Sequence, residues 1–340
     1  MITVIGQHPN QFNERDGMIQ RIAAIDNLIK CQKRRYLEIH FRKYWKGEHL
    51  VEDGIEVYKW NFFIYFFSIL SMLISSDYIY VHSIYNSRVV FPFLFFLKNI
   101  ITDLHGAVPD ELEMYGQNKR AKLYSWIESK VLYHSYKIIA VTEAMENYYT
   151  DKYPFTKGKF LCISIFSKMK TLQETNRKEN GVIYSGGTQK WQCIDIMKDL
   201  IANTYDIYNW TILTGDPGCF RNLNQSKIIL KSVKPEEVQK YYGQNSFGIV
   251  LREDSIVNRV ACPTKLIEYI SNGLIPVVLC PQIGDFYKYG YKFITYRNFR
   301  DNRLPSKEEV KQMRIENYKV LESIMDKTNE NIDELLRILS

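Results

Sequence analysis

Short apolar runs alternate with stretches of helical periodicity along the first half of the chain. The runs that predict strands cover residues 2–7, 35–41, 77–83, 99–106, 136–142 and 159–167. Apolar positions at helical spacing predict helices over residues 17–31, 60–74, 88–98, 119–135 and 143–153. Strands that alternate with helices in this way are typical of a parallel sheet with helices on both faces.

A polar segment without apolar periodicity interrupts this pattern, which then restarts. We predict a linker over residues 169–180. The later elements are predicted as strands 181–187, 210–215, 227–233, 247–253 and 274–280, with helices 191–202, 235–242 and 263–272. The sequence therefore predicts an α/β protein with two doubly wound, Rossmann-like domains, 1–168 and 181–305, that face each other across a cleft. Residues 306–340 are expected to form C-terminal helices that pack back toward the first domain.

The segment PTKLIEYISNG (263–273) has the start and stop signals of a complete short helix. Pro263 suits the first helical position, and Gly273 suits the position just past the end. Lys265 and Glu268 share a face that is separate from the apolar stripe. The free N–H groups at 264–266 and the Lys265 charge predict an anion site, and Glu268 can accept hydrogen bonds from sugar hydroxyls. The pattern fits a nucleoside diphosphate with its ribose, and a surface Lys–Glu pair is the alternative.

The bulk composition narrows the class of protein. The chain has 340 residues, a length that favours two domains, and 46% of them are hydrophobic. Its six cysteines form no CxxC pair, which argues against a zinc site or a disulfide framework and favours a reducing compartment. The first ten residues lack the pattern of a signal peptide. A net charge of +7 is too small to indicate a nucleic-acid partner.

One part of the first half combines basic and aromatic residues. Residues 30–46 hold seven Lys and Arg with Tyr36, Tyr44 and Trp45, and aromatic runs follow at 60–74 and 89–100. Neither run reaches the roughly 20 apolar residues that a transmembrane helix needs. We interpret the two runs as core helices. The alternative is a peripheral patch that contacts anionic lipid with its basic rim and inserts aromatic side chains.

Polar and glycine residues gather where the predicted strands end, which is the edge at which parallel sheets bind ligands. The first strand leads into a polar loop that ends on Gly17 and contains no GxGxxG fingerprint. Asp103 and His105 follow a later strand of the first half. Strands of the second half are followed by Gly186, Gly187 and Lys190 and by Arg252, Glu253 and Asp254.

Each group also has a purely structural interpretation. His105 fits a hydrogen-bonded turn histidine, and the glycine pair fits an ordinary strand-to-helix turn. The residues from Arg252 to Asp254 fit a solvated rim. Their concentration at the same edge of both predicted sheets favours the functional interpretation.

The segments TDLHGAVPDE, KIIAVTEAM, YSGGTQKWQ and PTKLIEYISNG, in this order, resemble retaining glycosyltransferases of the GT-B fold. The chain is most similar to glycosyltransferase family 4, which builds bacterial surface polysaccharides. This resemblance implies an N-terminal acceptor domain and a C-terminal domain that binds a nucleotide sugar. No DxD triplet is present, so neither a catalytic metal nor a cofactor beyond the nucleotide sugar is expected.

The resemblance also implies roles for individual residues. Glu268 would bind the ribose, while Lys190 and Lys265, helped by the turn at Thr264, would bind the diphosphate and stabilise it as leaving group. His105 would contact the donor sugar near the reacting carbon, and Asp103 would orient His105 or the acceptor. The remaining predicted donor contacts are the backbone at Gly17, the Gly186–Gly187 turn, Ser232 and Val233 at the base, Arg252 and Glu253.

Two positions depart from the pattern of the family. Val260 stands where the first acid of the E-x7-E motif is expected, eight residues before Glu268. Glu253 or Asp254 is a candidate replacement through a longer loop. Thr188 stands where an arginine usually follows the glycine pair.

The sequence thus predicts a retaining, metal-independent hexosyltransferase at the cytoplasmic face of the membrane. Its acceptor would be a glycan or lipid-linked oligosaccharide in capsule, exopolysaccharide or O-antigen synthesis. The alternatives are a nucleotide-sugar 2-epimerase on the same fold and a non-catalytic, glycosyltransferase-like binding subunit. The base, the sugar, the acceptor, the linkage and the oligomeric state stay open.

Overall fold

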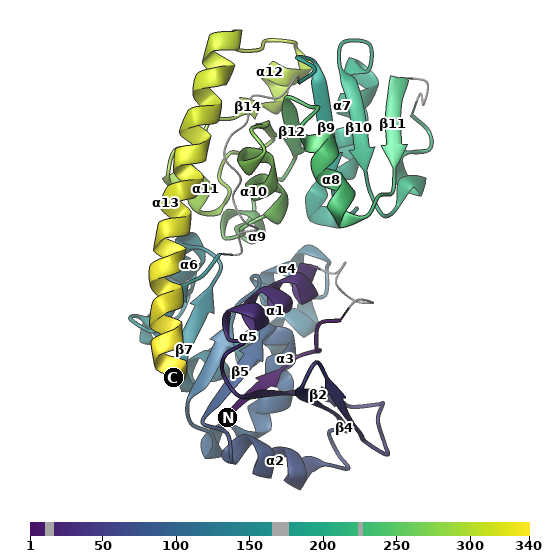
Figure 1. The fold of residues 1–340 in the computed structure, drawn as a ribbon. Helices are drawn as coiled ribbons and strands as arrows, with labels where there is room; N and C mark the ends of the chain where they lie inside the picture. Colours follow the sequence, from purple (N-terminus) through teal and green to yellow (C-terminus); the bar gives the residue numbers. More distant parts are fainter. Residues whose placement is uncertain (11–16, 165–176, 224–226) are drawn as a thin grey trace. The chain divides into compact units, whose positions relative to one another are not determined.

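The computed structural model describes residues 1–10, 17–164, 177–223 and 227–340 (Figure 1). The chain divides into two units. Unit 1 comprises Met1–Ile165 with Lys327–Ser340, and unit 2 comprises Phe166–Asp326. Most of the predicted linker lies outside the described residues, and strand β9 begins directly after it, at Gly181.

Unit 1 is built on an eight-stranded sheet in the order β3-β4-β2-β1-β5-β6-β7-β8. All neighbouring strands are parallel except the hairpin pair β3 and β4. The strands are β1 (Ile2–Ile5), β2 (Arg34–His40), β3 (Glu48–Glu52), β4 (Ile55–Asn61), β5 (Tyr78–His82), β6 (Ile100–Asp103), β7 (Ser135–Ala140) and β8 (Phe160–Cys162).

Helices connect these strands as the alternating pattern predicts, except from β2 to β4, where the sequence analysis missed the hairpin of β3 and β4. They are α1 (Gly17–Leu28), α2 (Phe66–Ile74), α3 (Ser83–Val90), η1 (Phe91–Phe96), α4 (Val108–Met114), α5 (Asn118–His134), α6 (Glu143–Lys152) and η2 (Pro154–Thr156). The end of the last helix, α13 (Lys307–Leu339), belongs to unit 1, where Leu335 and Leu339 pack with Ile2, Val4 and Ile22.

Unit 2 has a six-stranded, fully parallel sheet in the order β11-β10-β9-β12-β13-β14. The strands are β9 (Gly181–Ser185), β10 (Asn209–Leu213), β11 (Ile228–Lys231), β12 (Phe247–Val250), β13 (Ile275–Val278) and β14 (Ile294–Thr295). The helices are η3 (Lys190–Gln192), α7 (Ile194–Thr204), η4 (Pro217–Phe220), α8 (Pro235–Tyr242), α9 (Ile256–Arg259), α10 (Thr264–Ser271), α11 (Gly284–Lys288) and α12 (Tyr296–Arg300), together with the first part of α13.

Both sheets reverse their strand order once. The reversal lies between β1 and β5 in unit 1 and between β9 and β12 in unit 2. The carboxyl ends of the strands beside such a switch point are where doubly wound folds bind ligands. The topology therefore selects the residues after β5, β9 and β12 for closer attention.

The aromatic stretches of unit 1 differ from the predicted helices. The helix expected at 60–74 begins only at Phe66, because residues up to Asn61 complete strand β4 beside β2. The helix expected at 88–98 is replaced by the end of α3 and a 3-10 turn, η1, that contains Pro92. A proline there removes a backbone donor that an α-helix needs. No helix in the described part of the chain is both long and apolar enough to cross a membrane.

Candidate functional site

Two cations lie at the switch point of unit 2. Strand β9 ends at Ser185 and is followed by Gly186 and Gly187, while Arg252 follows β12 by two residues. Gly186 has a φ of 155°, a conformation open to glycine. A Cβ at Gly186 would lie 2.7 Å from the Lys265 ammonium, so the glycine admits the lysine head beside the strand end.

Lys265 is buried, with 7% of its surface exposed. Its ammonium donates to the side-chain oxygen of Gln192 at 2.8 Å and sits 4.1 Å from the ring centroid of Tyr184. Burial, and then repulsion from Arg252, lower its pKa well below the ordinary value, and Glu268 only partly opposes them. The alternative of a surface Lys–Glu pair is therefore wrong.

Arg252 is buried to the same extent as Lys265. One terminal nitrogen donates to the side chain of Asn258 at 3.1 Å, and its Nε has no hydrogen-bond partner. Burial lowers its pKa to about 10. Among the described residues neither side chain has a carboxylate within ion-pair distance, so two buried basic side chains share one strand edge without an ion-pair partner.

The solvated-rim interpretation is wrong for Arg252 and fits its neighbours. Glu253 and Asp254 are exposed, and Asp254 pairs with Arg259 at 2.6 Å. The backbone oxygen of Glu253 accepts from the side-chain amide of Asn258 at 2.9 Å. Whether either acid replaces the residue missing at Val260 stays a prediction.

Glu268 is half-buried, one turn after Lys265 on α10. The hydroxyl of Tyr242 donates to its carboxylate at 2.7 Å. Burial raises its pKa, while the Tyr242 hydrogen bond and the nearby Lys265 charge act in the opposite direction. The carboxylate retains acceptor capacity for hydroxyl groups of a ligand.

The start of α10 differs in two details from the prediction. Pro263 is the cap residue before the helix and not its first residue, and its carbonyl accepts the N–H of Leu266 at 2.9 Å. The expected anion site therefore keeps the N–H groups of Thr264 and Lys265 and loses that of Leu266. The predicted terminus is confirmed, since Gly273 has a φ of 71°.

Three other predicted donor residues lie at the surface of unit 2. Lys190 is exposed and begins the same turn, η3, that supplies Gln192 to Lys265. Ser232 is exposed, and Val233 is half-buried in the loop after β11. The roles assigned to these three residues stay predictions.

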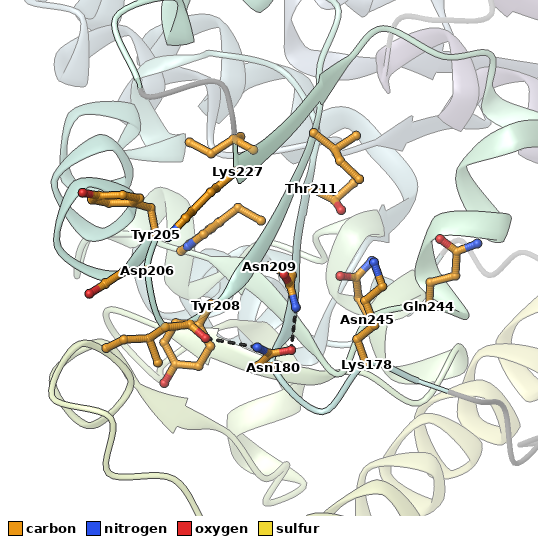
Figure 2. Close-up of a pocket in the computed structure, with 14 residues that line it drawn as sticks. Lys178, Asn180, Tyr205, Asp206, Tyr208, Asn209, Thr211, Lys227, Gln244 and Asn245 are labelled. Carbon is orange, nitrogen blue, oxygen red and sulfur yellow. Dashed lines mark hydrogen bonds between the residues drawn. The ribbon is translucent and has the colours of Figure 1, made fainter.

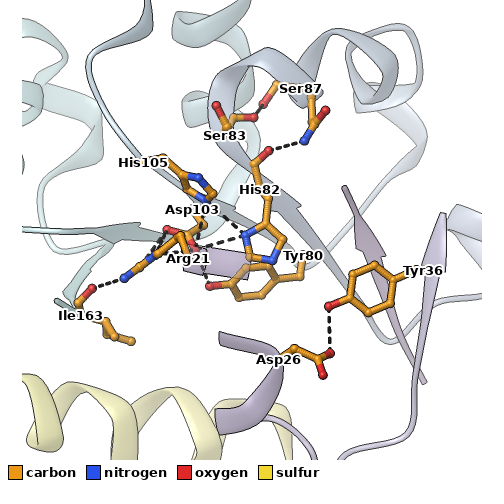
Figure 3. Close-up of polar contacts among 11 residues, drawn as sticks. Arg21, Asp26, Tyr36, Tyr80, His82, Ser83, Ser87, Asp103, His105 and Ile163 are labelled. Atoms are coloured by element: carbon orange, nitrogen blue, oxygen red, sulfur yellow. Dashed lines mark hydrogen bonds and ion pairs between the residues drawn. The ribbon is translucent and has the colours of Figure 1, made fainter. Parts of the chain in front are cut away.

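The switch point of unit 1 holds a second polar cluster (Figure 3). Asp103, the last residue of β6, is fully buried and accepts from the guanidinium of Arg21 at 2.9 Å and from the Tyr80 hydroxyl at 3.1 Å. Burial alone would raise the pKa of Asp103, but Arg21 and then His105 hold it well below the usual range. Asp103 is thus an anion fixed inside unit 1.

Two histidines flank this carboxylate. His82 Nδ1 lies 3.2 Å from His105 Nε2 and 3.4 Å from Asp103 Oδ2. Burial lowers the pKa of His82 to about 4, so it is neutral near pH 7. The Nε2 of His105 also lies 3.6 Å from Asp103 Oδ2, so either histidine can donate a proton to this carboxylate. Among the described residues, His105 Nδ1 has no hydrogen-bond partner, so this nitrogen is available to a polar group of a ligand.

His82, Asp103 and His105 also offer metal-ligand atoms that lie within 4.8 Å of one another. Arg21 already occupies both oxygens of the Asp103 carboxylate, at 2.9–3.3 Å. A bound cation would have to share that carboxylate with the guanidinium, which makes a proton-transfer or hydroxyl-binding role the better fit to these residues.

Several of these residues escaped the sequence analysis. His82 pairs with Asp103 in the β5–β6 register, so only the strand pairing brings it to the site. Ser83, next to it, has a φ of 65°, a strained value for a non-glycine residue. Glu111, from α4, lies so close to Gly106 that a Cβ there would collide with its carboxylate. Burial, and then Asp110, raise the pKa of Glu111 to about 7.

Gly17 is the first residue of α1, and the loop before it lies outside the described residues beyond position 10. The predicted site residues therefore form two groups. Asp103 and His105 come together in unit 1, whereas Gly186, Arg252, Lys265 and Glu268 come together in unit 2.

No protein-family model matches the chain, and no curated protein matches it in sequence. Solved structures do match it. HepE of Anabaena in complex with UDP-glucose has a TM-score of 0.69 at 10% identity, over 99% of each chain. The E. coli trehalose-6-phosphate structure bound with UDP-2-fluoro glucose has a TM-score of 0.65 at 10% identity, over 99% of this chain and 98% of that one.

A UDP-forming α,α-trehalose-phosphate synthase from Burkholderia vietnamiensis has a TM-score of 0.65 at 11% identity, over 99% of this chain and 98% of that one. These are glycosyltransferases with two parallel-sheet domains. The chain has the GT-B fold. At these identities the similarity establishes the fold, which agrees with the sequence prediction, and carries no activity with it.

One cavity of this GT-B chain lies away from the switch points (Figure 2). It has a volume of about 520 Å³ and opens at the amino ends of β9, β10 and β11. The side chain of Asn180 lines this cavity. It donates a hydrogen bond to the Ile207 carbonyl at 3.1 Å and accepts one from the Asn209 side chain at 2.6 Å. Ligands of doubly wound sheets bind at the opposite, carboxyl edge, so this cavity is separate from the site in unit 2.

Proposed function

We propose that the protein is a glycosyltransferase that uses a nucleotide sugar and binds its diphosphate in unit 2. The observation that carries this proposal is the pair Lys265 and Arg252, buried at the carboxyl edge of the sheet with no protein carboxylate at ion-pair distance among the described residues. Unpaired buried charges are costly, and a bound anion supplies the missing partner.

The surrounding groups suit a diphosphate more than a carboxylate. The N–H groups of Thr264 and Lys265 open helix α10, whose dipole favours an anion. The Gly186–Gly187 turn lets the backbone approach the ligand. Lys190, which is exposed at the start of η3, would add a further positive charge. Positive charge placed where the leaving diphosphate gains negative charge lowers the barrier to transfer.

Glu268 fits the ribose, because it lies one helical turn beyond Lys265, the residue proposed to bind the diphosphate. Its carboxylate is held in place by a hydrogen bond from Tyr242. We place the base beside Ser232 and Val233, in the loop after β11. UDP is the first candidate among the nucleotides, because the matching structures of HepE and of the E. coli protein contain UDP or a UDP sugar.

In unit 1, His105 would donate from Nδ1 to a sugar hydroxyl near the reacting carbon. The anionic Asp103 would orient it together with His82. This assignment is supported by the unsatisfied Nδ1 and by the fixed carboxylate 3.6 Å from the other ring nitrogen.

Retention of configuration, membership of glycosyltransferase family 4 and a lipid-linked acceptor in surface-polysaccharide synthesis are finer parts of the proposal. They are supported by the order of the TDLHGAVPDE, YSGGTQKWQ and PTKLIEYISNG segments along the chain. The lysines and Arg252 provide the charge that a metal ion supplies in other transferases, so we expect transfer to proceed with chelator present.

The experiment that tests the proposal is a thermal-shift screen against UDP, GDP, ADP, CMP and dTDP, followed by transfer assays with sugars of the preferred base. A nucleoside diphosphate that binds the folded state raises the melting temperature with its concentration. We expect one base to stand out. If no nucleotide shifts the melting temperature and no sugar is released from a broad panel, the proposal fails.

A 2-epimerase is the second candidate, and the structure provides more support for it than the sequence did. Such chemistry needs acid and base groups around the sugar, and unit 1 collects His82, His105, Asp103 and a Glu111 whose pKa is raised to about 7 by burial. Product analysis without an acceptor separates the two, because an epimerase returns an isomeric nucleotide sugar and a transferase does not. The Val260 departure keeps a third candidate, a binding subunit without turnover, which would bind the nucleotide and transfer nothing.

A further inference from the structure

Large exposed hydrophobic side chains are concentrated in unit 1. Sixteen of the twenty in the described part of the chain lie there, although the two units have similar lengths. The most exposed are Phe95 at 90% and Phe67 at 81%, with Phe63, Phe96 and Tyr133 each above half. Single exposed hydrophobic residues are ordinary, but a concentration on one unit marks an interaction surface.

These side chains flank one core cluster and are linked by ring contacts. Phe67 contacts Phe66, which packs on the buried Phe93 of η1 at 4.7 Å between centroids. From the same 3-10 turn Phe91 lies 4.5 Å from Trp126 of α5. Helix α2, turn η1 and helix α5 therefore pack around one aromatic core, and each of them carries exposed aromatic side chains.

A second link joins η1 to the end of α5. Phe95 lies 5.6 Å from the ring of His134, which contacts Tyr133 at 5.4 Å. We call Phe63, Phe67, Phe95, Phe96, Trp126 and Tyr133 the aromatic surface.

The outward face of α5 interleaves this surface with cations. Five exposed residues of α5 fall at positions i, i+3, i+7, i+11 and i+14 and so share one face: Lys119, Lys122, Trp126, Lys130 and Tyr133. At 100° per residue these positions occupy one stripe less than a third of the helix circumference wide. Lysine stems beside Trp and Tyr are typical of helices that lie at a membrane interface.

The same stripe carries no negative charge. The acidic residue of α5, Glu128, lies on the opposite face, is buried, and pairs with Lys152 at 2.9 Å. Helix α2 contains no charged residue at all. The region therefore offers aromatic rings and positive charge only, which is the complement of an anionic lipid headgroup layer.

We infer that the aromatic surface and the lysine stripe of α5 dock unit 1 onto a bilayer that contains anionic lipid. A second copy of the chain is the poorer occupant, because a two-fold contact would place the lysine stripe against itself. The basic segment 30–46 contributes less than the sequence suggests, since Tyr36 is buried and Arg34 is paired with Asp26 at 2.6 Å. This inference rests on unit 1 alone and does not depend on the transfer reaction.

The test is co-sedimentation of the full chain with vesicles of phosphatidylcholine alone or with about 30% phosphatidylglycerol, at low and high salt. We expect binding to the anionic vesicles that weakens as screening increases. Replacing Lys119, Lys122 and Lys130 by Gln should lower the partition coefficient by about 100-fold, at roughly fivefold for each lysine. Replacing Phe95 and Trp126 by Ser should lower it by about tenfold.

The matched control replaces three exposed lysines of unit 2, Lys227, Lys240 and Lys319, by Gln. It removes the same charge and should keep the wild-type partition coefficient. The inference is overturned if the wild-type protein ignores anionic vesicles at low salt, or if the control loses as much binding as the α5 variant. It is equally overturned if sedimentation velocity shows a stable dimer that the Phe95 and Trp126 changes dissociate. Nucleotide binding by unit 2 is measured separately, so failure here leaves the proposed function standing.

Discussion

Replacing Lys265 by Gln removes one buried positive charge from unit 2 and retains an amide that can donate to Gln192. Two unit charges about 4 Å apart interact by about 4 kcal/mol at an effective dielectric constant near 20. The depressed pKa of Lys265, caused first by burial, means that part of this energy is spent on protonating the lysine. We therefore expect nucleoside diphosphate binding to weaken by about 2–3 kcal/mol, or about 30- to 150-fold.

The same change should leave folding almost untouched. Lys265 has no carboxylate partner at ion-pair distance among the described residues, so no ion pair is broken, and removal of its desolvated charge offsets the lost contact with Tyr184. We expect the unfolding free energy to change by less than about 1 kcal/mol, which is about 2–4 °C in melting temperature. Lys240 on α8 is exposed, and its change to Gln is the matched control for both measurements.

Isothermal titration and thermal melting together decide this prediction. A role in ligand binding requires a large loss of affinity with little loss of stability. The reasoning is refuted if the Lys265 variant binds as tightly as the wild type, or if it melts far lower while the Lys240 variant does not. The first result would exclude a role of Lys265 in binding, and the second would make it a structural residue.

Three further predictions address the neighbouring groups. Replacing Glu268 by Gln should weaken nucleoside diphosphate binding by about tenfold. Pyrophosphate binding should stay unchanged, because only the ribose loses a hydrogen-bond acceptor. Equal losses of affinity for the two ligands in calorimetry would contradict this. Replacing Asp103 by Asn leaves Arg21 buried without its anion and should cost unit 1 about 3–5 kcal/mol in urea unfolding; a cost below about 1 kcal/mol would contradict it. Diphosphate binding should take up a proton, because Lys265 has a pKa depressed by burial and binds the anion when charged. Titrations in buffers of different ionisation enthalpy report this uptake, and affinity should fall as pH rises through the depressed pKa; buffer-independent heats would rule it out.

The depressed pKa of Lys265 also sets how the stability of the unliganded protein depends on pH. The unfolded chain, in which Lys265 has its ordinary pKa, binds the proton of the Lys265 ammonium more strongly than the folded chain does. The unfolding free energy therefore rises with pH between the folded and the unfolded pKa of Lys265. Asp103 acts at the acid end, because its lowered pKa stabilises the fold above the unfolded value and this contribution is lost as pH falls.

The sequence predicted the parallel α/β architecture and a helix at 263–272, which the structure places at Thr264–Ser271, because both depend on local signals. Apolar periodicity, a proline before the helix and a glycine after it fix that element without reference to distant residues. The misplaced start of the helix predicted at 60–74 has a local cause as well. Aromatic residues suit both strands and helices, so periodicity alone did not show that strand β4 extends to Asn61.

The buried residues of each site could not be placed from the sequence, because they meet through contacts between residues far apart in the chain. Gln192 meets Lys265 across 73 positions, and His82 meets Asp103 only through the register of β5 and β6. Arg252 and Glu253 are neighbours in the sequence, yet the first is buried and the second exposed. Adjacent residues in extended chain point to opposite sides, and the sequence does not say which side is the interior.

The central claim is that buried cations of unit 2 hold the diphosphate of a nucleotide sugar. Its most direct test is calorimetric titration of the unmodified protein with a nucleoside, its monophosphate and its diphosphate, all with the preferred base. The account predicts that the diphosphate binds at least about 100-fold more tightly than the nucleoside, since two buried charges contact its phosphates. Equal affinities for the three ligands would contradict it.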